Sequence, residues 1–148
     1  MKSFLYAARG IVRAVRAGCN LRIQLAAAFY VVLFGFWQGL SATDWAVELV
    51  CCALVLSLEI VNTAVERLCD RVTRQSDLDI AAVKDMAAGA VLTAAVVSAV
   101  VWVVILCRGG YWPVLSGLLF GHLWPWAVLL VTAAAAAIWI ISAGRKKR

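Results

Sequence analysis

The sequence is poor in charged and polar residues. Only 15% of its 148 residues are charged and 65% are hydrophobic, and the mean hydropathy is +0.93. A soluble domain is about 45–50% apolar, so this chain has too little polar surface to cover a globule. The composition excludes an ordinary soluble domain and indicates that the lipid bilayer is the solvent of this chain.

Patterns for disulfide bonds and metal centres are also missing. The five cysteines show no C-x-x-C or Cys/His spacing, and Cys51 and Cys52 are adjacent, so that they leave a helix in different directions. We interpret all five as unpaired thiols. The single histidine, His122, lies beside an interfacial cluster of aromatic residues. We interpret it as structural rather than as a ligand.

Four apolar stretches, residues 23–40, 45–65, 86–106 and 123–143, occupy most of the chain. Each is close to the length of about 20 residues that crosses a hydrocarbon core as a helix. A basic segment precedes the first stretch and no A-x-A-like site follows it closely, so we expect a retained span rather than a cleaved signal peptide. We predict one all-α membrane domain over residues 1–148, in which the fourth span serves packing and topology only.

The net charge of +6 is distributed unevenly over this four-span path. Thirteen of the 14 lysines and arginines fall on one side, and only Arg108 lies on the other. The positive-inside rule makes the crowded side cytoplasmic. We therefore predict a bacterial inner-membrane protein with both termini in the cytoplasm. Because topology accounts for the charge, we predict no nucleic-acid partner.

Residues 2–18 have the pattern of an amphipathic helix lying in the membrane surface. At 100° per residue, one stripe about 60° wide carries the basic side chains and the opposite side is apolar. The basic residues are Lys2, Arg9, Arg13 and Arg16, and the apolar ones are Phe4, Ala8, Ile11 and Val15. Gly18 ends the segment. The arginines are expected to hold anionic head groups, and a second possibility is that some of them face the phosphates of ATP.

Polar residues recur on one face of the second span. Glu59, Asn62, Glu66 and Asp70 lie at positions i, i+3, i+7 and i+11, within an arc about 80° wide on a helix. Glu59 lies inside the apolar stretch, where a charged side chain costs about 2.5–3.5 kcal/mol on insertion scales. Such a residue requires a partner, a metal ion or a catalytic role.

These residue types suit the chemistry of cations and phosphates. Mg²⁺ prefers one or two carboxylates together with substrate phosphates, and Glu66 is near enough to the cytoplasm to meet Mg-ATP. Glu59 lies deeper, where it can accept the proton of a lipid hydroxyl, and Asn62 lies between them. Lys84 offers a positive charge for phosphate, and we place Asp85 in the first turn of the next helix.

Ordinary ion pairs are the alternative for this region. Glu66 could pair with Arg67 or Arg71, and Asp70 with Arg74. Lys84 and Asp85 could simply mark the start of a helix. The spacing alone therefore predicts an intramembrane acidic site for cation or phosphate chemistry and goes no further.

The same residues carry a resemblance to a known family. Residues 59–70 fit the pattern E-x-x-N-[ST]-A-[IV]-E-x-x-x-D, and a Lys-Asp pair at Lys84 and Asp85 precedes a span rich in Ala and Gly. This core resembles the small prokaryotic lipid kinases, which comprise diacylglycerol kinase and undecaprenol kinase. The segments SFLYAARGI and NLRIQL are also similar to that family. The resemblance covers roughly residues 3–106.

The resemblance implies an ATP- and Mg²⁺-dependent lipid kinase that phosphorylates undecaprenol or diacylglycerol at the cytoplasmic face. It also implies a homotrimer with composite sites. In this family, Glu59 would be the catalytic base, Asn62 would orient the site and Glu66 would bind Mg²⁺. Contacts to ATP would come from Tyr6, Glu66, Asp70, Gln75, Ser76, Asp77, Lys84 and Asp85, and the lipid substrate would meet Glu59, Arg13 and Arg22. Asn62 followed by Thr63 favours the undecaprenol branch.

The sequence departs from the family at two places, and these departures raise alternatives to an active lipid kinase. The family has a second metal-binding glutamate just before the first span, and this chain has Gly18 at that position. The fourth span is also additional, because typical members have three. A non-catalytic or regulatory protein with an altered metal site is therefore the main alternative. A transporter that uses Glu59 is a weaker one, because the spans lack an inverted repeat and Gly/Pro-broken helices.

Overall fold

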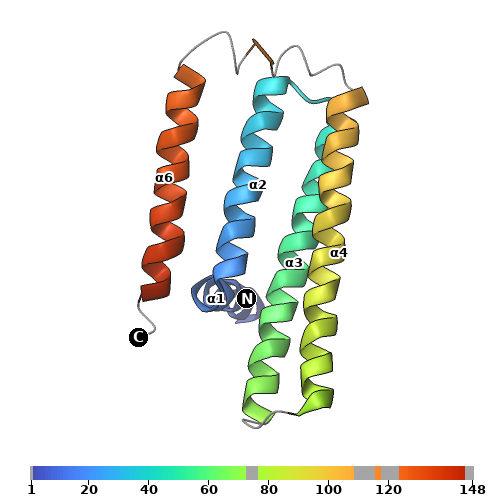
Figure 1. The fold of residues 1–148 in the computed structure, drawn as a ribbon, viewed down its shortest axis with the longest axis vertical. Coiled ribbons are helices and arrows are strands. Elements are labelled where there is room, and N and C mark those ends of the chain that lie inside the picture. Colours follow the sequence, from blue (N-terminus) through green and yellow to red (C-terminus); the bar gives the residue numbers. More distant parts are fainter. Residues whose placement is uncertain (1, 73–76, 109–115, 118–123, 146–148) are drawn as a thin grey trace.

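The computed structural model describes residues 2–72, 77–108, 116–117 and 124–145, and these ranges contain no strand. Its helices are α1 (Lys2–Ala17), α2 (Cys19–Gln38), α3 (Ala42–Val72), α4 (Leu78–Arg108) and α6 (Trp124–Arg145). The axes of helices α2, α3, α4 and α6 are roughly aligned, and successive helices run in opposite directions. Helix α1 lies across the lower end of the bundle (Figure 1). The prediction of an all-α membrane protein with an N-terminal helix is confirmed.

Three helices, α2, α3 and α4, are long and apolar enough to cross a membrane by length and composition. Helix α6 contributes a shorter apolar segment, Val128–Ile141, among the residues that were described. It lies beside α2 and runs antiparallel to it (Figure 1). The Tyr30 hydroxyl on α2 donates a hydrogen bond to Thr132 Oγ1 on α6 over 3.0 Å. This bond links α6 to the rest of the bundle.

The change of direction between α1 and α2 occurs at Gly18. The Gly18 N–H donates to the Ala14 carbonyl over 3.1 Å, which completes the last turn of α1. The backbone of Gly18 is then extended, with φ −107° and ψ 140°, so the helical hydrogen-bond pattern stops. Ala14 is buried where α1 packs against its neighbours. As a result, α1 is held against the lower part of α2 and α3.

Helices α3 and α4 pack side by side as an antiparallel hairpin that extends below α1 (Figure 1). Asp77 begins α4, because its Oδ1 accepts the N–H groups of Asp79 over 2.9 Å and Ile80 over 3.3 Å. The prediction that Asp85 lies in the first turn of this helix was wrong. That turn contains Asp79, because the Asp77 cap starts the helix well before the apolar stretch.

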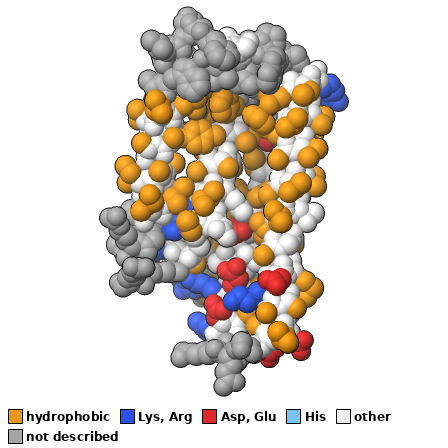
Figure 2. Space-filling view, viewed as in Figure 1, with side chains coloured by type: hydrophobic (Ala, Val, Ile, Leu, Met, Phe, Trp, Pro, Cys, Tyr) orange, Lys and Arg blue, Asp and Glu red, His pale blue; other side chains and the backbone are white. Residues whose placement is uncertain are grey.

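The surface of the bundle is divided into an apolar band and a charged end. Hydrophobic side chains cover the middle and upper part of the helices, and lysine, arginine, aspartate and glutamate gather at the lower end (Figure 2). Large apolar side chains such as Leu54, Leu92 and Leu130 are exposed, as expected for a surface that faces lipid. The charged end is the one that carries α1.

Candidate active site

Glu59 is buried on α3 and has a partner on another helix. Its side chain is only 3% exposed, and Gln24 Nε2 on α2 donates a hydrogen bond to Glu59 Oε2 over 3.2 Å. A buried carboxylate requires such donors, because its transfer out of water is otherwise strongly unfavourable. The amide of Gln24 therefore fixes one oxygen of Glu59 and leaves the other available.

Asn62 and Glu66 continue the same face of α3 toward the charged end. Asn62 is 4% exposed, and its Nδ2 donates to Glu66 Oε1 over 3.2 Å. Glu66 itself is half-buried. Because α3 is continuous from Ala42 to Val72, the three side chains occupy one helical face over about 10 Å. The structure therefore brings together the residues that the sequence predicted for proton transfer and metal binding.

Two acceptor oxygens near this face have no hydrogen-bond partner among the described residues. They are Gln24 Oε1 and Asn62 Oδ1, and both are buried. Gln24 is the residue that contacts Glu59, and Asn62 lies about one helical turn from Glu59 on α3. Buried polar atoms are normally paired, so these two acceptors are suited to a bound group that donates hydrogen bonds. A hydroxyl group or a hydrated cation would supply the missing donors or charge.

Gly18 faces this site from the start of α2. A Cβ atom added to Gly18 would lie 3.7 Å from Thr63 Oγ1 and 3.9 Å from the Ala14 carbonyl, which are ordinary contact distances. Thr63 is buried and follows Asn62 directly on α3. The position where the resembling family carries a glutamate is thus turned toward α3, but Gly18 contributes no side-chain oxygen.

The oxygen atoms of this region suit a hard cation. No group of three His, Cys, Asp or Glu side chains able to hold a metal occurs in the described part of the chain. Mg²⁺ usually keeps several waters and takes one or two carboxylates plus substrate phosphates. Glu66, with the free Oδ1 of Asn62 beside it, fits that requirement when the phosphates of ATP supply the remaining oxygens.

Asp70 and Lys84, both predicted to contact ATP, contact each other. Lys84 Nζ on α4 donates to Asp70 Oδ1 on α3 over 2.9 Å, and their side chains are 40% and 66% exposed. Among the described residues, no ion pair joins Glu66 to Arg67 or Arg71, so that alternative is not found. Arg67, Asp70 and Arg71 instead line an open groove near the charged end.

The other predicted contacts are spread over the lower end. Tyr6 on α1 is 64% exposed, and Arg13, Asp77 and Asp85 are also exposed. Asp77 caps α4, while Gln75 and Ser76 lie outside the described residues, as does Arg74. Arg22 is buried in a groove between α1, α2 and α6. The structure therefore does not place Arg22 together with Glu59.

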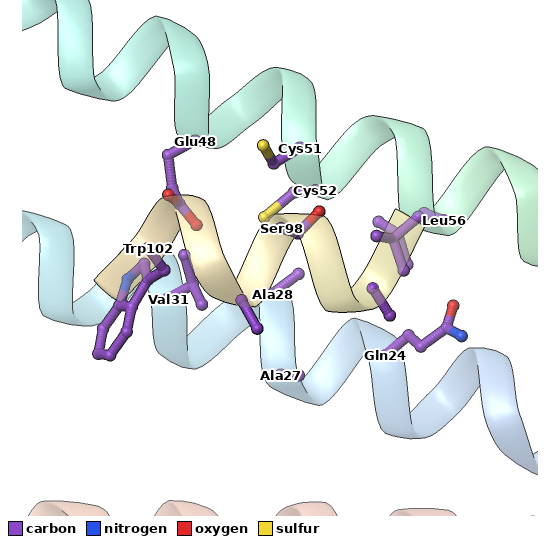
Figure 3. A pocket seen from close by; sticks show the side chains of 13 residues that line it. Gln24, Ala27, Ala28, Val31, Glu48, Cys51, Cys52, Leu56, Ser98 and Trp102 are labelled. Carbon is purple, nitrogen blue, oxygen red and sulfur yellow. The ribbon is translucent and has the colours of Figure 1, made fainter. Parts of the chain in front are cut away.

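A second buried glutamate lines a mostly apolar pocket farther from the charged end. A pocket of about 300 Å³ between α2, α3 and α4 has Gln24 and Leu56 at one end and Glu48 and Trp102 at the other (Figure 3). Glu48 is 3% exposed, and its Oε2 has no partner among the described residues. The sequence analysis missed Glu48, although a charge inside an apolar stretch is the signal that identified Glu59.

Gln24 was also missed as a site residue. It belongs to the NLRIQL segment, but it is separated from Glu59 by 35 positions. No regular spacing within one helix connects the two residues. Only the packing of α2 on α3 brings them together.

Comparison with known proteins establishes the family to which this chain belongs. The family model described as prokaryotic diacylglycerol kinase matches residues 5–106. The chain belongs to the prokaryotic diacylglycerol kinase family. The match includes Glu59, Asn62 and Glu66, and it ends before α6. The predicted family is confirmed, and the chain is a membrane lipid kinase of this type.

Two relatives illustrate the similarity within the family. The undecaprenol kinase of Bacillus subtilis is 38% identical over 104 residues, which cover 70% of this chain and 85% of that protein. The diacylglycerol kinase of a Synechocystis species is 37% identical over 100 residues, which cover 67% of this chain and 57% of that protein. No solved structure gives a significant match.

Proposed function

We propose that this family member transfers the γ-phosphate of Mg-ATP to the hydroxyl of a lipid alcohol at the cytoplasmic face, with undecaprenol as the preferred substrate. The buried carboxylate of Glu59, oriented by Gln24 over 3.2 Å, is the observation that carries the proposal. Glu59 lies two helical turns from Glu66 on the same face of α3, so a lipid hydroxyl beside Glu59 and a nucleotide phosphate beside Glu66 can meet.

Glu59 acts as the general base. It accepts the proton of the lipid hydroxyl while the hydroxyl oxygen forms a bond to the γ-phosphorus. The bond between the γ-phosphorus and the β–γ bridging oxygen breaks, and ADP leaves. Phosphoryl transfer depends mainly on positioning and on neutralising charge. Gln24 keeps the Glu59 carboxylate in place, and the free Oδ1 of Asn62 can accept a hydrogen bond from an ordered water or from the substrate.

Glu66 binds the Mg²⁺ that accompanies ATP, with Asn62 holding its carboxylate. When bound, Mg²⁺ neutralises negative charge on the phosphates. Lys84 contacts the phosphates from α4, with Asp70 restraining its ammonium group until the nucleotide arrives. Tyr6, Asp77 and Asp85, together with Gln75 and Ser76, complete the nucleotide site. Arg13 and Arg22 hold the lipid near the membrane surface.

The preference for undecaprenol rests on the Asn62-Thr63 pair and on the similarity to the Bacillus subtilis undecaprenol kinase. The test is transfer of radiolabelled γ-phosphate in mixed micelles that contain either undecaprenol or diacylglycerol. The expected result is a higher kcat/KM for undecaprenol. An equal or higher kcat/KM for diacylglycerol would reverse the preference without affecting the kinase assignment.

The catalytic role is tested by Glu59→Gln, which keeps the shape of the side chain but removes the base. General-base catalysis contributes about 10²- to 10⁴-fold, so a loss of that size is expected. Glu48→Gln is the matched control, because Glu48 is an equally buried glutamate on the same helix. Retained activity in Glu59→Gln, or absence of transfer to any lipid alcohol by the folded wild-type protein, would overturn the proposal.

A second candidate function is a non-catalytic or regulatory role. Gly18 favours it, because the residue faces Thr63 without supplying a metal ligand. If this role is correct, the wild-type protein binds nucleotide with activity near zero, and Gly18→Glu produces a large gain in transfer.

The assembly and orientation of the protein are part of the proposal. We infer a homotrimer in the inner membrane with both termini in the cytoplasm. The concentration of charge at one end of the bundle supports this orientation. Light scattering of the detergent complex tests the number of subunits. Labelling of Cys107 in intact cells with a membrane-impermeant maleimide tests the orientation, since Cys107 lies at the end remote from α1 and is exposed.

A further inference from the structure

Glu48 of α3 is a buried acid with an unpaired oxygen atom. Its side chain is 3% exposed, and Oε2 is buried with no hydrogen-bond partner among the described residues. Burying a carboxyl group is unfavourable unless another group supplies hydrogen bonds or an opposite charge. The proposed phosphate transfer makes no use of Glu48. The residue is therefore suited to a bound group that serves some other purpose.

The pocket beside Glu48 has room for such a group. Its volume is about 300 Å³, at the lower end of the range of about 300–1,000 Å³ that is usual for small-molecule sites. Its walls are mostly hydrophobic side chains of α2, α3 and α4. Ser98 also lines it, but the Ser98 hydroxyl already donates to the Ala94 carbonyl over 2.7 Å. At the end remote from Gln24, Glu48 thus offers the unused polar atom.

The charges around the pocket favour a cation. None of the residues that line it is basic, and Glu48 is the one acid among them. Arg108, at the same end of α4, pairs with Asp44 over 3.8 Å. Within the described ranges, no ion pair involves Glu48. A bound cation would supply the counter-ion that these parts of the chain do not.

Trp102 favours an organic cation over an inorganic one. Figure 3 shows Glu48 of α3 and Trp102 of α4 at the same end of the pocket. The face of an indole ring attracts an ammonium group, and a carboxylate beside it adds an opposite charge. A hard metal ion would find one carboxylate here, which is fewer oxygen ligands than it requires. A phospholipid head group would bring a phosphate, and the pocket has no basic residue to neutralise it.

We propose that this pocket binds a lipophilic amine. The ammonium group lies between Glu48 and Trp102, and the hydrocarbon part contacts the apolar walls. Where the Glu48 carboxyl is protonated, the neutral amine takes its proton, and where it is ionised the ammonium ion binds directly, so the pair carries no net charge. Ala27, which lines the pocket from α2, is exposed, so an amine dissolved in the bilayer can approach from that side. The site does not depend on the proposed function, since no nucleotide, metal or transfer step is involved.

The test measures binding of radiolabelled amantadine, a rigid lipophilic amine, to the full-length protein in detergent by equilibrium dialysis. Protein-free micelles give the background. Adamantanol, which has the same hydrocarbon cage with a hydroxyl in place of the ammonium group, is the matched competitor. Glu48→Gln removes the charge, and Ala28→Leu fills the pocket. We expect saturable binding to the wild type, at least tenfold weaker affinity in both variants, and at least tenfold weaker competition by adamantanol.

Two control variants match these substitutions outside the pocket. Glu59 is the other buried glutamate of α3, and it does not line the pocket. Ala134 is an exposed alanine of α6. Glu59→Gln and Ala134→Leu should each change the affinity for amantadine less than twofold.

Several outcomes would overturn this site. Absence of saturable binding would remove it, and equal competition by adamantanol would remove the argument from charge. An equal loss of affinity in Glu59→Gln would show that the effect is not particular to Glu48. Unchanged affinity in Ala28→Leu would place the amine outside this pocket. If Glu48→Gln loses its helical circular dichroism, Ala28→Leu and the competition by adamantanol decide the result.

Discussion

Gln24 of α2 donates a hydrogen bond to Glu59 of α3 over 3.2 Å, and both residues lie within the part of the chain that matches the family. The bond joins two helices at a buried carboxylate. It fixes the rotation of α2 against α3, and it also fixes the carboxylate. Gln24 is therefore a positioning residue in the proposed reaction.

Replacing Gln24 with leucine removes this donor and should lower kcat about tenfold to a hundredfold, since a hydrogen bond to a charged group contributes about 1.5–3 kcal/mol. The KM for ATP should stay within twofold, because Gln24 does not face the nucleotide. Steady-state kinetics at saturating lipid separate the two parameters. Gln38→Leu is the control, because Gln38 is a buried glutamine at the opposite end of α2. A change in KM with constant kcat would contradict the positioning role.

Gly18→Glu should reduce the concentration of Mg²⁺ needed for half-maximal activity. The extended backbone accepts a side chain, and the Cβ position is 3.7 Å from Thr63 Oγ1, so the new carboxylate can reach the region of Asn62 and Glu66. Residues that support a metal site typically change its affinity about 10- to 100-fold, and an effect in this range is expected. Gly18→Gln separates charge from size. A Mg²⁺ requirement that is identical in Gly18→Glu and Gly18→Gln would show that the position is no longer part of the metal site.

Lys84→Met should raise the KM for ATP several-fold while thermal unfolding in detergent changes little. The ion pair with Asp70 is exposed, and exposed pairs contribute little to stability. Asp70→Asn leaves the ammonium group in place and should have the smaller effect on KM. Nucleotide titrations at fixed lipid concentration check both variants. A large loss of thermal stability without a change in KM would assign Lys84 to the hairpin rather than to the nucleotide.

Glu48→Met should stabilise the protein. The carboxyl of Glu48 has a buried oxygen without a partner in the described residues, and an unpaired buried polar group costs about 1–3 kcal/mol in proteins. Methionine also fits the apolar pocket that Glu48 lines. The measurement is the apparent Tm in detergent, with Leu49→Met on the lipid-facing side as the control. A lower Tm would indicate that Glu48 has a partner from another subunit.

The sequence was sufficient for the membrane architecture and for the acidic face of α3. Glu59, Asn62 and Glu66 share a face because helical periodicity is a local property, and α3 is one unbroken helix. The family could also be predicted, since its core motif lies within residues 59–85. These features depend on residues that are close together in the chain.

The features that the sequence did not predict depend on packing or on a local capping residue. The contact between Gln24 and Glu59 and the groove around Arg22 require the rotation of α2 relative to α3, α1 and α6, which no spacing within α2 reveals. The early start of α4 depends on the side chain of Asp77, which accepts two backbone N–H groups. Apolar stretches locate the membrane-spanning part of a helix but not its ends, so Asp85 was placed about two turns too early in its helix.

Helix α6 reverses the direction of the chain once more, and it ends near the level of α1 (Figure 1). Because successive helices α2, α3, α4 and α6 alternate in direction, the start of α2 and the end of α6 lie on the same side of the bundle (Figure 1). A protein domain or fluorescent label attached after α6 would therefore lie on the same side of the bundle as the polar ends of α3 and α4. A C-terminal reporter would thus be on the side of the bundle where we propose that phosphate transfer occurs.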